Sequence, residues 1–568
     1  MPVKVKHGRL AESMERSTPI LRLDLLRAYK PEWFLGDLTA GVVIFLTTIP
    51  AALAYGHLAG LQPINGLYAS LLALAVYAFF GTSRQLIINP EAAVAILVAT
   101  SVASVYSGGD PVRFATLAML QAIMIGVMQV CAGVGRLGFV SDFIPKSVVS
   151  GFINGVALVI ILAQAGRFLG IELKNEAFIP RVVELASRAH EAHLLTLYIG
   201  VACLLGMLIM RPLLRRVPEA VVMVVIATLV VTHWDLGAQG VNLVGLVPAG
   251  LPHLVMPNVG ITDILAMWPV AAGVALVSYL DTTMTGRAFA MRGRYRLEPN
   301  QELIALGVAN LGTGLFQGFA IGSSHSRTAL NEMSGGRSQF AGLLAAIFLG
   351  VFLIYFTGIL KNVPTVALAA IIILAGIYLL RLREIVGMFR IRPATAYMSL
   401  VTTAAVLIAG IMAGILVSVA MAIVLVLHRL ARPFETIIRD PEMPGLLVYR
   451  FAGPLYFFNA AYFTNRVQDL IDSSQPPVTV FMISAEAIVD MDGDAAENLG
   501  ELHDSLKSQG IILGVYDAKG DFRKVLMGTR LTTRIGFNLY PSLAEALVEL
   551  SKVPPEVAEK VNAEISGT

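Results

Sequence analysis

Charged side chains are scarce in this sequence. Asp, Glu, Lys and Arg make up 14% of its 568 residues, whereas a soluble globular protein carries roughly 25%. Hydrophobic residues reach 56%, and the mean hydropathy is +0.72. These values exclude an ordinary soluble protein and indicate a polytopic membrane protein. The formal net charge of +3 is too small to suggest nucleic acid as a partner.

Cysteines, catalytic motifs and a cleavable signal are also lacking. Cys131 and Cys203 are the two cysteines; they fit no metal spacing and imply no disulfide framework, so we interpret both as membrane-embedded packing residues. The sequence contains no catalytic constellation, and we expect neither an enzyme nor a bound cofactor. The first residues, MPVKVKHGRLAESMERS, lack the basic-then-apolar pattern of a cleaved signal and predict a cytoplasmic tail.

The composition changes sharply near residue 433. Before it, long apolar runs follow one another; after it, charge density rises and no run could cross a bilayer. We therefore predict an N-terminal tail at 1–34, a membrane domain at 35–431, a soluble domain at 432–550 and a C-terminal tail at 551–568.

The membrane domain contains fourteen candidate segments, several of them shorter than the roughly 20 residues that a span needs. They lie near residues 38–57, 64–80, 88–105, 113–133, 148–168, 194–210, 218–233, 263–283, 301–316, 324–335, 339–359, 364–380, 395–410 and 412–430.

Positive charge supports an even number of spans with both termini inside the cell. Cytoplasmic loops carry an excess of Lys and Arg, and the loop after every even-numbered segment contains arginine, whereas 57–63 and 234–262 contain neither basic residue. The loop at 169–192 mixes both signs and predicts a small outer helix. We expect a multi-pass protein of the bacterial inner membrane.

Segments three and ten are interrupted. The third begins GTSRQLIINPEAAVAILVA, where Pro90 favours an extended stretch over 86–89 and a helix that starts at Pro90 itself. The tenth lies in GTGLFQGFAIGSSHSRTALNEM, whose four glycines favour unwound chain. We expect its helix to begin near Ser324 or Ser326, where a hydroxyl can cap it.

The interrupted segments lie seven apart, which suggests two halves of seven segments each. An odd-numbered repeat forces opposite orientations, and paired broken segments in inverted repeats indicate a transporter binding site. Two helix N-termini, each with free N–H groups and partial positive charge, would face each other there and form an anion site. The alternative is that both segments are loops rather than half-helices.

Several side chains near these breaks are candidate ligands. Arg327 could lend positive charge to an anion or, alternatively, brace the protein by pairing with a carboxylate. Residues Ser324, His325 and Ser326 could bind the anion or satisfy the backbone at the break. Other candidates lining this site are Ala51, Tyr55, Pro90, Glu91 and Ala92.

Acidic residues near the breaks suggest cation coupling. A fixed charge on Glu91 would repel an anion, so we expect it to be protonated during transport or paired with Arg327. Asp281 and Thr285 are four residues apart, on one face of a helix, and could share a small cation. The alternative is that Asp281 pairs with Arg287.

Three long motifs resemble one known family. They are DLTAGVVIFLTTIPAALAYGHLAGLQPINGLYAS (37–70), EPNQELIALGVANLGTGLFQGFAIGSSHSRTALN (298–331) and LLVYRFAGPLYFFNAAYF (446–463). The first two resemble signatures of the SulP anion transporters, which include sulfate permeases, bicarbonate and dicarboxylate carriers, prestin and pendrin. The third resembles the start of that family's C-terminal STAS domain.

The resemblance implies fourteen segments in a seven-plus-seven inverted repeat, with a core domain that moves against a gate domain in a homodimer. It also implies that Asp281 and Thr285 match the sodium ligands of sodium-coupled bicarbonate members, while many other members are thought to use protons. Two departures stand out. Ala51 replaces a frequent glutamine that helps to hold an oxyanion, and the loop at 492–495 reads Asp-Gly-Asp-Ala, without the hydroxyl that is phosphorylated in stand-alone STAS proteins.

The soluble domain alternates strand-like runs (478–489 and 511–518) with a helical pattern at 495–510, which predicts a small α/β domain. It could be regulatory, bind a cytoplasmic protein partner or stabilise a dimer. The sequence as a whole predicts a secondary active transporter of a small oxyanion in contact with membrane lipid. Sulfate is the first candidate, bicarbonate or a dicarboxylate the others, and proton or sodium symport is expected. The alternatives are a passive anion channel and an anion exchanger.

Overall fold

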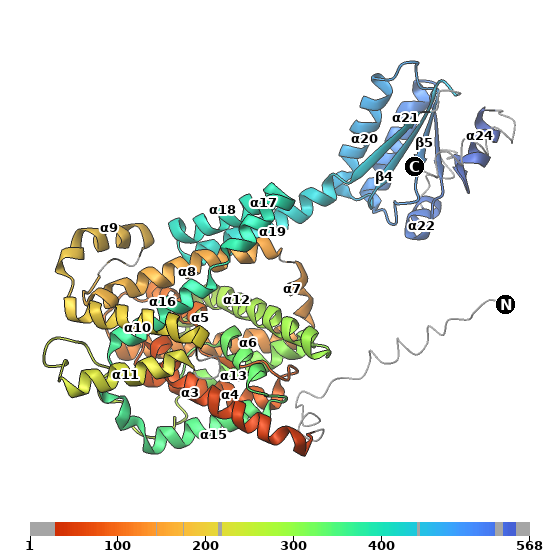
Figure 1. The fold of residues 1–568 in the computed structure, drawn as a ribbon. Helices are drawn as coiled ribbons and strands as arrows, with labels where there is room; N and C mark the ends of the chain where they lie inside the picture. The colour runs from red at the N-terminus through yellow and green to blue at the C-terminus, as the bar shows by residue number, and fades with distance from the viewer. Residues whose placement is uncertain are drawn as a thin grey trace. The chain divides into compact units, whose positions relative to one another are not determined.

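The chain divides into two compact units, Met1–Ala422 and Ile423–Thr568, which are described separately (Figure 1). The computed structural model describes residues 29–143, 145–173, 175, 177–213, 218–439, 443–528 and 538–551. Most of the predicted N-terminal tail and nearly all of the C-terminal tail lie outside these residues. The unit boundary falls inside a helix, and the division at 431/432 stays a prediction from composition.

Among the described residues of the first unit and the adjoining α19, fourteen helices correspond to the fourteen predicted segments. They are α3 (Phe34–Leu58), α4 (Pro63–Phe80), α5 (Ala92–Val105), α6 (Pro111–Val134), α8 (Lys146–Leu169), α10 (Leu194–Leu213), α11 (Glu219–His233), α12 (Ile261–Gly293), α13 (Pro299–Leu315), α14 (His325–Met333), α15 (Phe340–Tyr355), α16 (Thr365–Leu379), α18 (Pro393–Ala409) and α19 (Ile411–Ala431).

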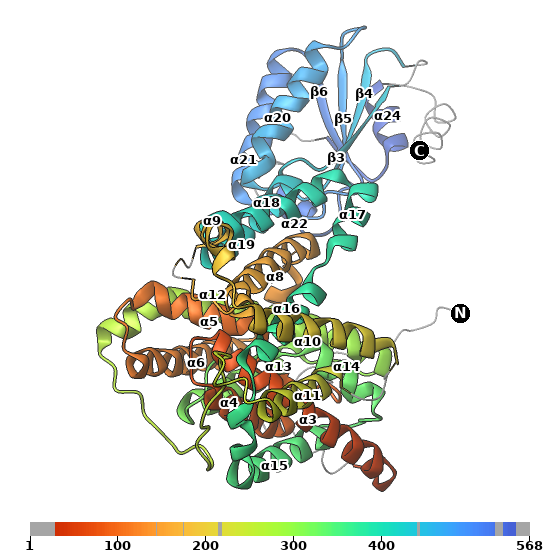
Figure 2. The same ribbon diagram turned by 60° about the vertical axis from the view of Figure 1, so that its left-hand side comes forward.

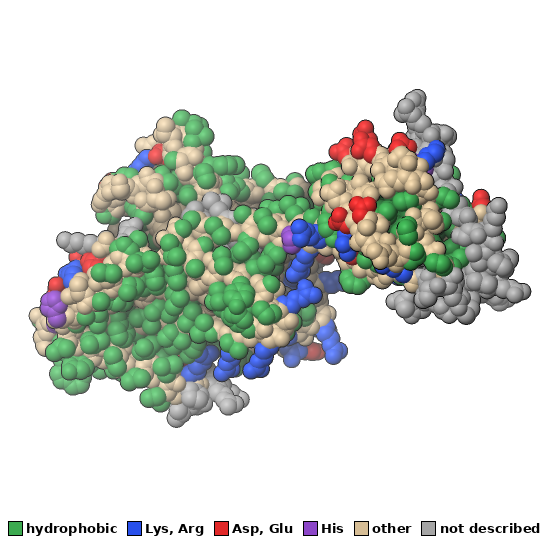
Figure 3. Space-filling model, turned by 90° about the horizontal axis from the view of Figure 1, so that it is seen from above, with side chains coloured by type: hydrophobic (Ala, Val, Ile, Leu, Met, Phe, Trp, Pro, Cys, Tyr) green, Lys and Arg blue, Asp and Glu red, His purple; other side chains and the backbone are tan. Residues whose placement is uncertain are grey.

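The helices of this unit are built for a bilayer. Seven helices of the described chain are long and apolar enough to cross one. In the same residues, α4, α6, α13 and α18 begin with proline, whose missing N–H costs nothing at the first helical position. Figure 3 shows a broad hydrophobic surface on this unit, with Lys and Arg side chains gathered beside it. This arrangement is typical of a protein that spans a membrane.

Shorter elements connect the spans. The small helix predicted within 169–192 is α9 (Phe178–Arg188), and its placement on the outer side stays a prediction, whereas α17 (Leu382–Ile391) was not expected. The others are α7 (Val140–Phe143) and the 3-10 turns Pro31–Trp33, Leu137–Phe139, Ala189–Glu191 and Thr357–Asn362.

The packing of the spans follows an inverted repeat. If α3–α11 form one half and α12–α19 the other, two prominent contacts have counterparts: α6 packs on α13 as α15 packs on α4, and α8 packs on α18 as α10 packs on α16. Segments one to four of both halves pack together as the core, and the remaining segments form the gate. Close approach needs small residues, because a Cβ on Gly126 of α6 would lie 2.7 Å from the carbonyl oxygen of Gly307 in α13.

Two helix boundaries and one cysteine differ from the predictions. Helix α5 begins at Ala92 rather than Pro90, because the side chain of Glu91 caps it from an extended conformation. Gly312 and Gly314 lie within α13 rather than in unwound chain, since helix interiors tolerate glycine at a cost of about 1 kcal/mol. Cys203 is buried as expected, but Cys131 is exposed, so its interpretation as a packing residue is wrong.

A buried carboxylate anchors the loop that leads into the third segment. Glu302 of α13 is fully buried. It accepts hydrogen bonds from the Tyr77 hydroxyl at 2.7 Å, from the backbone N–H groups of Thr82 at 2.8 Å and Ser83 at 3.2 Å, and from the Thr82 hydroxyl. One side chain from the second half thus fixes a loop of the first half.

We expect Glu302→Gln to lower the free energy of unfolding by about 2 kcal/mol, because the amide turns an NH2 group towards donors and leaves a buried group unpaired. Thermal unfolding of the detergent-purified protein measures this. Glu298→Gln, one turn earlier and exposed, serves as the control. Equal unfolding temperatures for the two variants would contradict the anchoring role.

The second unit is a five-stranded sheet with helices on both faces. The strands β3 (Phe434–Arg439), β4 (Leu446–Ala452), β5 (Val480–Ser484), β6 (Ile512–Tyr516) and β7 (Asn538–Tyr540) lie in that order, and all neighbours are parallel except β3 and β4. Figure 2 shows α20 (Phe457–Asp472) and α21 (Gly493–Ser508) on one face and α24 (Leu543–Ser551) on the other. Helix α22 (Gly520–Gly528) joins the first face. The predicted α/β fold is confirmed.

One aspartate in the loop at 492–495 joins two helices. The carboxylate of Asp492 accepts from the N–H of Ala495 in α21 at 2.9 Å and from the N–H of Phe457 in α20 at 2.8 Å. Asp494 lies in the first turn of α21, where negative charge is favourable. Because residues 492–495 carry no hydroxyl, we predict that this loop is not a phosphorylation switch.

We expect Asp492→Ala to weaken the start of both helices by about 1–2 kcal/mol, the usual cost of a lost cap. Hydrogen exchange of the full chain should then show faster exchange in the first turns of α20 and α21. Asp492→Asn, which retains an acceptor, should exchange almost as slowly as the parent, and Asp494→Ala is the surface control. Unchanged exchange in Asp492→Ala would refute the double cap.

Candidate anion-binding site

The two interrupted segments meet through a short antiparallel ladder. Strand β1 (Ile88–Asn89) pairs with β2 (Gly322–Ser323), with Ile88 opposite Ser323 and Asn89 opposite Gly322. Both strands lead directly into helices, α5 and α14. Two half-helices therefore begin next to each other, as predicted.

The N-terminal turns of the half-helices are capped differently. The N–H of Ala93 donates to Glu91 Oε2 at 2.9 Å, so α5 already holds a carboxylate of its own. Helix α14 is capped by the Ser324 hydroxyl, which accepts from the N–H of Arg327 at 3.5 Å. Ser324 is buried, whereas His325 and Ser326 are exposed, so the α14 end is the more open to an incoming anion.

Arg327 links the two half-helices. Its side chain is buried, with Nη2 donating to the carbonyl oxygen of Pro90 at 2.6 Å. The guanidinium carbon lies 5.8 Å from the centre of the Tyr55 ring, within range of a cation–π interaction. Arg327 Nε is buried without a hydrogen-bond partner among the described residues. Among those residues no ion pair with Glu91 forms; the partner of Arg327 is backbone.

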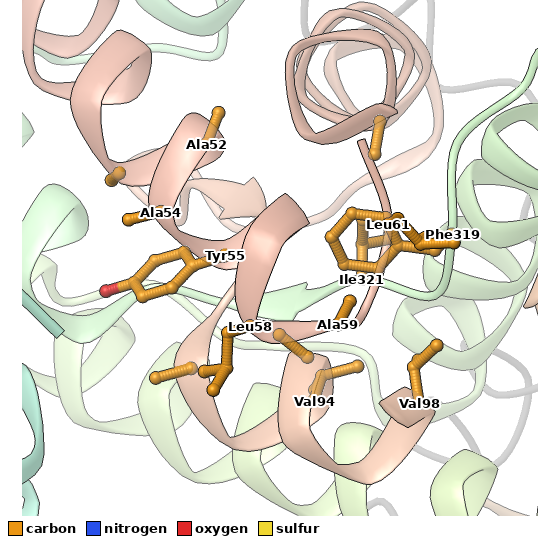
Figure 4. Close-up of a cluster of buried hydrophobic side chains, with 14 of the residues drawn as sticks. Ala52, Ala54, Tyr55, Leu58, Ala59, Leu61, Val94, Val98, Phe319 and Ile321 are labelled. Carbon is orange, nitrogen blue, oxygen red and sulfur yellow. The ribbon is translucent and has the colours of Figure 1, made fainter. Parts of the chain in front are cut away.

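The predicted residues of the first segment lie behind this ladder. Ala51 and Tyr55 are buried in α3, and the Asn89 side chain donates to the Thr48 hydroxyl at 3.1 Å, which ties β1 to the same helix. Figure 4 shows Leu58 and Ala59 facing Val94 and Val98 of α5. The half-helix α5 thus lies against α3 through small and branched apolar side chains.

A cavity of about 60 Å³ brings two of the predicted acids together. Glu91 and Asp281 line it, and the other lining residues are apolar side chains of α5, α8, α12 and the end of α16. Two carboxylates therefore border one small apolar space between core and gate helices. Placing an anion there requires that this negative charge be neutralised.

Asp281 is surrounded by hydroxyl and imidazole groups rather than by Arg287. The Ser323 hydroxyl donates to Asp281 Oδ2 at 2.6 Å and lies 3.0 Å from Thr285 Oγ1. The ring nitrogens of His325 lie 2.9 and 3.1 Å from Thr285 Oγ1, and Nδ1 lies 3.8 Å from Asp281 Oδ1. Asp281 and Thr285 do share a face, and β2 completes the group.

Ser323 was missed by the sequence reasoning. Capping chemistry predicts a role for Ser324 but not for Ser323. Successive side chains of a strand point to opposite sides, so Ser324 caps α14 while Ser323 faces Asp281. Thr328 was missed as well; its hydroxyl accepts from the N–H of Ile87 at 3.0 Å. The alternation within GSSHS was the signal that could have found Ser323.

The oxygens of this group suit a small hard cation. The Asp281 carboxylate and the hydroxyls of Thr285 and Ser323 are the ligand types that such ions prefer. No cluster of three or more His, Cys, Asp and Glu side chains able to hold a metal ion occurs among the described residues.

Comparisons with known proteins agree with this architecture. The sulfate permease family model matches residues 34–402, and the STAS domain model matches residues 438–546. A probable sulfate transporter of Mycobacterium tuberculosis (strain CDC 1551 / Oshkosh) is 34% identical over 526 residues, covering 90% of this chain and 94% of that protein. The chloroplastic sulfate transporter 4.1 of Arabidopsis thaliana is 28% identical over 568 residues, covering 94% and 82%.

Solved structures share the fold. Murine solute carrier 26 family member A9, an anion transporter in the inward-facing state, superposes with a TM-score of 0.86 at 19% identity, covering 97% of each chain. The transmembrane domain of the cyanobacterial bicarbonate transporter BicA gives 0.61 at 24% identity, covering 70% of this chain and 98% of that one. The resemblance seen in the three sequence motifs is confirmed: the chain belongs to the sulfate permease family and ends in a STAS domain.

Proposed function

We propose that this protein is a secondary active transporter of a small oxyanion, with sulfate as the first candidate and bicarbonate or a dicarboxylate as the others. The main support is the junction of α5 and α14. Here the N-termini of two half-helices lie next to each other and are joined by the β1–β2 ladder and by Arg327. The first-turn N–H groups of a helix lack intrahelical partners and carry partial positive charge, which makes them an anion site.

The residues proposed to bind the anion are those exposed at this junction. Ser326 and His325 are accessible at the start of α14, and the buried Arg327 raises the potential behind them rather than binding the anion itself. Tyr55, Ala51, Pro90 and Ala92 shape the opposite wall. Because Ala51 offers no hydrogen bond, the backbone N–H groups carry most of the recognition, which favours a compact anion with several acceptor oxygens.

Glu91 and Asp281 supply the coupling. Moving one negative charge into a negative interior costs about 2.3 kcal/mol per 100 mV, so accumulation needs a cotransported cation or an exchanged anion. A proton on Glu91 or Asp281 would remove the repulsion in the shared cavity. A sodium ion held by Asp281, Thr285 and Ser323 would do the same.

The division into core and gate supports a mechanism of alternating access. The ladder and both half-helices belong to the core, whereas α8 and α16 of the gate close the cavity that Glu91 and Asp281 line. A shift of the core past the gate would open this cavity to one side and then the other. The competing functions are a passive anion channel and an anion exchanger.

Uptake of labelled sulfate into proteoliposomes distinguishes these functions. Symport predicts accumulation above the external concentration under an inward proton or sodium gradient, and collapse when both gradients are removed. Purely downhill flux that ignores both gradients would establish a channel, and uptake that requires internal anion would establish an exchanger. Competition by bicarbonate and by dicarboxylates, with and without sodium, identifies the substrate class.

The same proposal includes the location and the assembly of the protein. The protein would be a multi-pass transporter of the bacterial inner membrane with both termini in the cytoplasm, not an enzyme and without nucleic acid as a partner. It would work as a homodimer in contact with membrane lipid. The STAS domain would be regulatory, through a cytoplasmic protein partner or the dimer.

A further inference from the structure

Helix α17 has no role in the proposed transport cycle. It was not expected from hydropathy, because its sequence LREIVGMFRI (382–391) is short and contains three charged residues. Its connections to the spans on both sides are short, since α16 ends at Leu379 and α18 begins at Pro393. A helix tied so closely between two membrane segments cannot leave the bilayer surface.

The faces of α17 are sharply divided. Ile385 is buried, and the helix packs on α18 and α8. Leu382 and Val386, 59% and 56% exposed, lie one turn apart and form an apolar stripe that no described residue covers. Phe389 continues the stripe and stacks edge-on against Tyr397. This is the surface of a helix that is half embedded in a nonpolar medium.

Two arginines run beside the stripe. Arg383 and Arg390 are both exposed and lie two turns apart, so they project from nearly the same side of the helix. No ion pair among the described residues involves either one, whereas Arg381 pairs with Glu384 at 3.9 Å. Arg392 adds a third exposed charge at the C-terminal end. Figure 3 shows that Lys and Arg gather beside the apolar surface of this unit.

We propose that α17 is a binding site for anionic phospholipid. Leu382, Val386 and Phe389 contact the acyl chains, while Arg383 and Arg390 contact the phosphate headgroups at the level where long basic side chains reach the interface. The positive charge selects anionic over zwitterionic lipid. Because α17 packs on α8 and α18 of the gate, bound lipid also holds this part of the gate at the interface.

Quenching by brominated lipids tests the site directly. A thiol-reactive fluorophore is attached to the full chain at Val386→Cys. The exposed Cys131 is replaced by serine so that it does not react, and Cys203 can stay because it is buried. The protein is then reconstituted with brominated phosphatidylglycerol or brominated phosphatidylcholine. We expect phosphatidylglycerol to bind about tenfold more tightly at the label, given a fewfold preference for each arginine. We expect this preference to weaken in high salt.

Two variants with matched charge changes complete the test. Arg383→Gln with Arg390→Gln should reduce the preference to at most the fewfold that the remaining Arg392 can give, whereas Lys519→Gln with Lys524→Gln, which removes two exposed charges from the STAS domain, should leave it intact. Equal binding of both lipids by the parent, or an undiminished preference in the arginine variant, would overturn the proposal. A label that neither lipid quenches would mean that another protein surface covers α17, which also overturns it.

Discussion

Arg327→Ala should abolish transport in a protein that still inserts and purifies. The substitution removes the charge behind the anion site and also the donor to the Pro90 carbonyl. A hydrogen bond that involves a charged group is worth about 1.5–3 kcal/mol, and the anion also loses the field of the guanidinium. We therefore expect uptake of labelled sulfate in proteoliposomes to fall by roughly a hundredfold or more.

Two further variants separate electrostatics from folding. Arg327→Lys keeps the charge but not the planar fork, so it should recover part of the uptake if the field matters and almost none if only the hydrogen bond to Pro90 matters. Arg337→Ala removes an exposed arginine ten residues further on and should transport like the parent. Kinetics in Arg327→Ala that match the parent would refute any role for Arg327 in transport.

Asp281→Asn should uncouple transport. Asparagine has nearly the same shape and can still accept from the Ser323 hydroxyl, but it carries no charge to balance a proton or a sodium ion. We expect accumulation against a gradient to disappear, so that internal and external sulfate concentrations become equal, while exchange of labelled for unlabelled anion continues. Uptake with and without imposed gradients, followed by counterflow, measures both halves of this expectation.

The control for this variant lies on a surface turn. Asp235 is exposed and has a positive φ of 44°, a conformation that asparagine also adopts readily, so Asp235→Asn should transport and couple like the parent. Persistent uphill uptake in Asp281→Asn would show that coupling does not use this residue. Glu91 would then be the remaining candidate for the coupling group.

Much of the fold follows from the sequence because its dominant signals are local. Apolar length located the fourteen segments, and the two interrupted ones were recognisable from Pro90 and from the glycines before Ser324. Helix α17 was not predicted, because a short amphipathic helix at an interface has neither the length nor the uniform apolarity of a span. Periodicity rather than mean hydropathy was the signal it offered.

The contacts of the candidate site were less accessible to sequence reasoning. The charge of Arg327 was expected to act on an anion or to pair with a carboxylate, and its hydrogen bond to the backbone carbonyl of Pro90 was not expected. Every residue has a carbonyl, so sequence cannot identify such a partner. Likewise Ser323 faces Asp281 because of strand register, which depends on pairing with a segment more than 200 residues earlier.

The ladder between β1 and β2 has a consequence for biogenesis. The first half cannot satisfy its own backbone at the break: the N–H and C=O of Ile87 pair with Thr328 and Ser324, and the carbonyls of Pro90 and Gln85 accept from Arg327 and Asn331. Within hydrocarbon each unpaired group costs several kcal/mol. A nascent chain that has delivered only seven segments to the translocon must therefore keep its third segment in water or protein until the tenth arrives, and a half-length product should be cleared by membrane proteases.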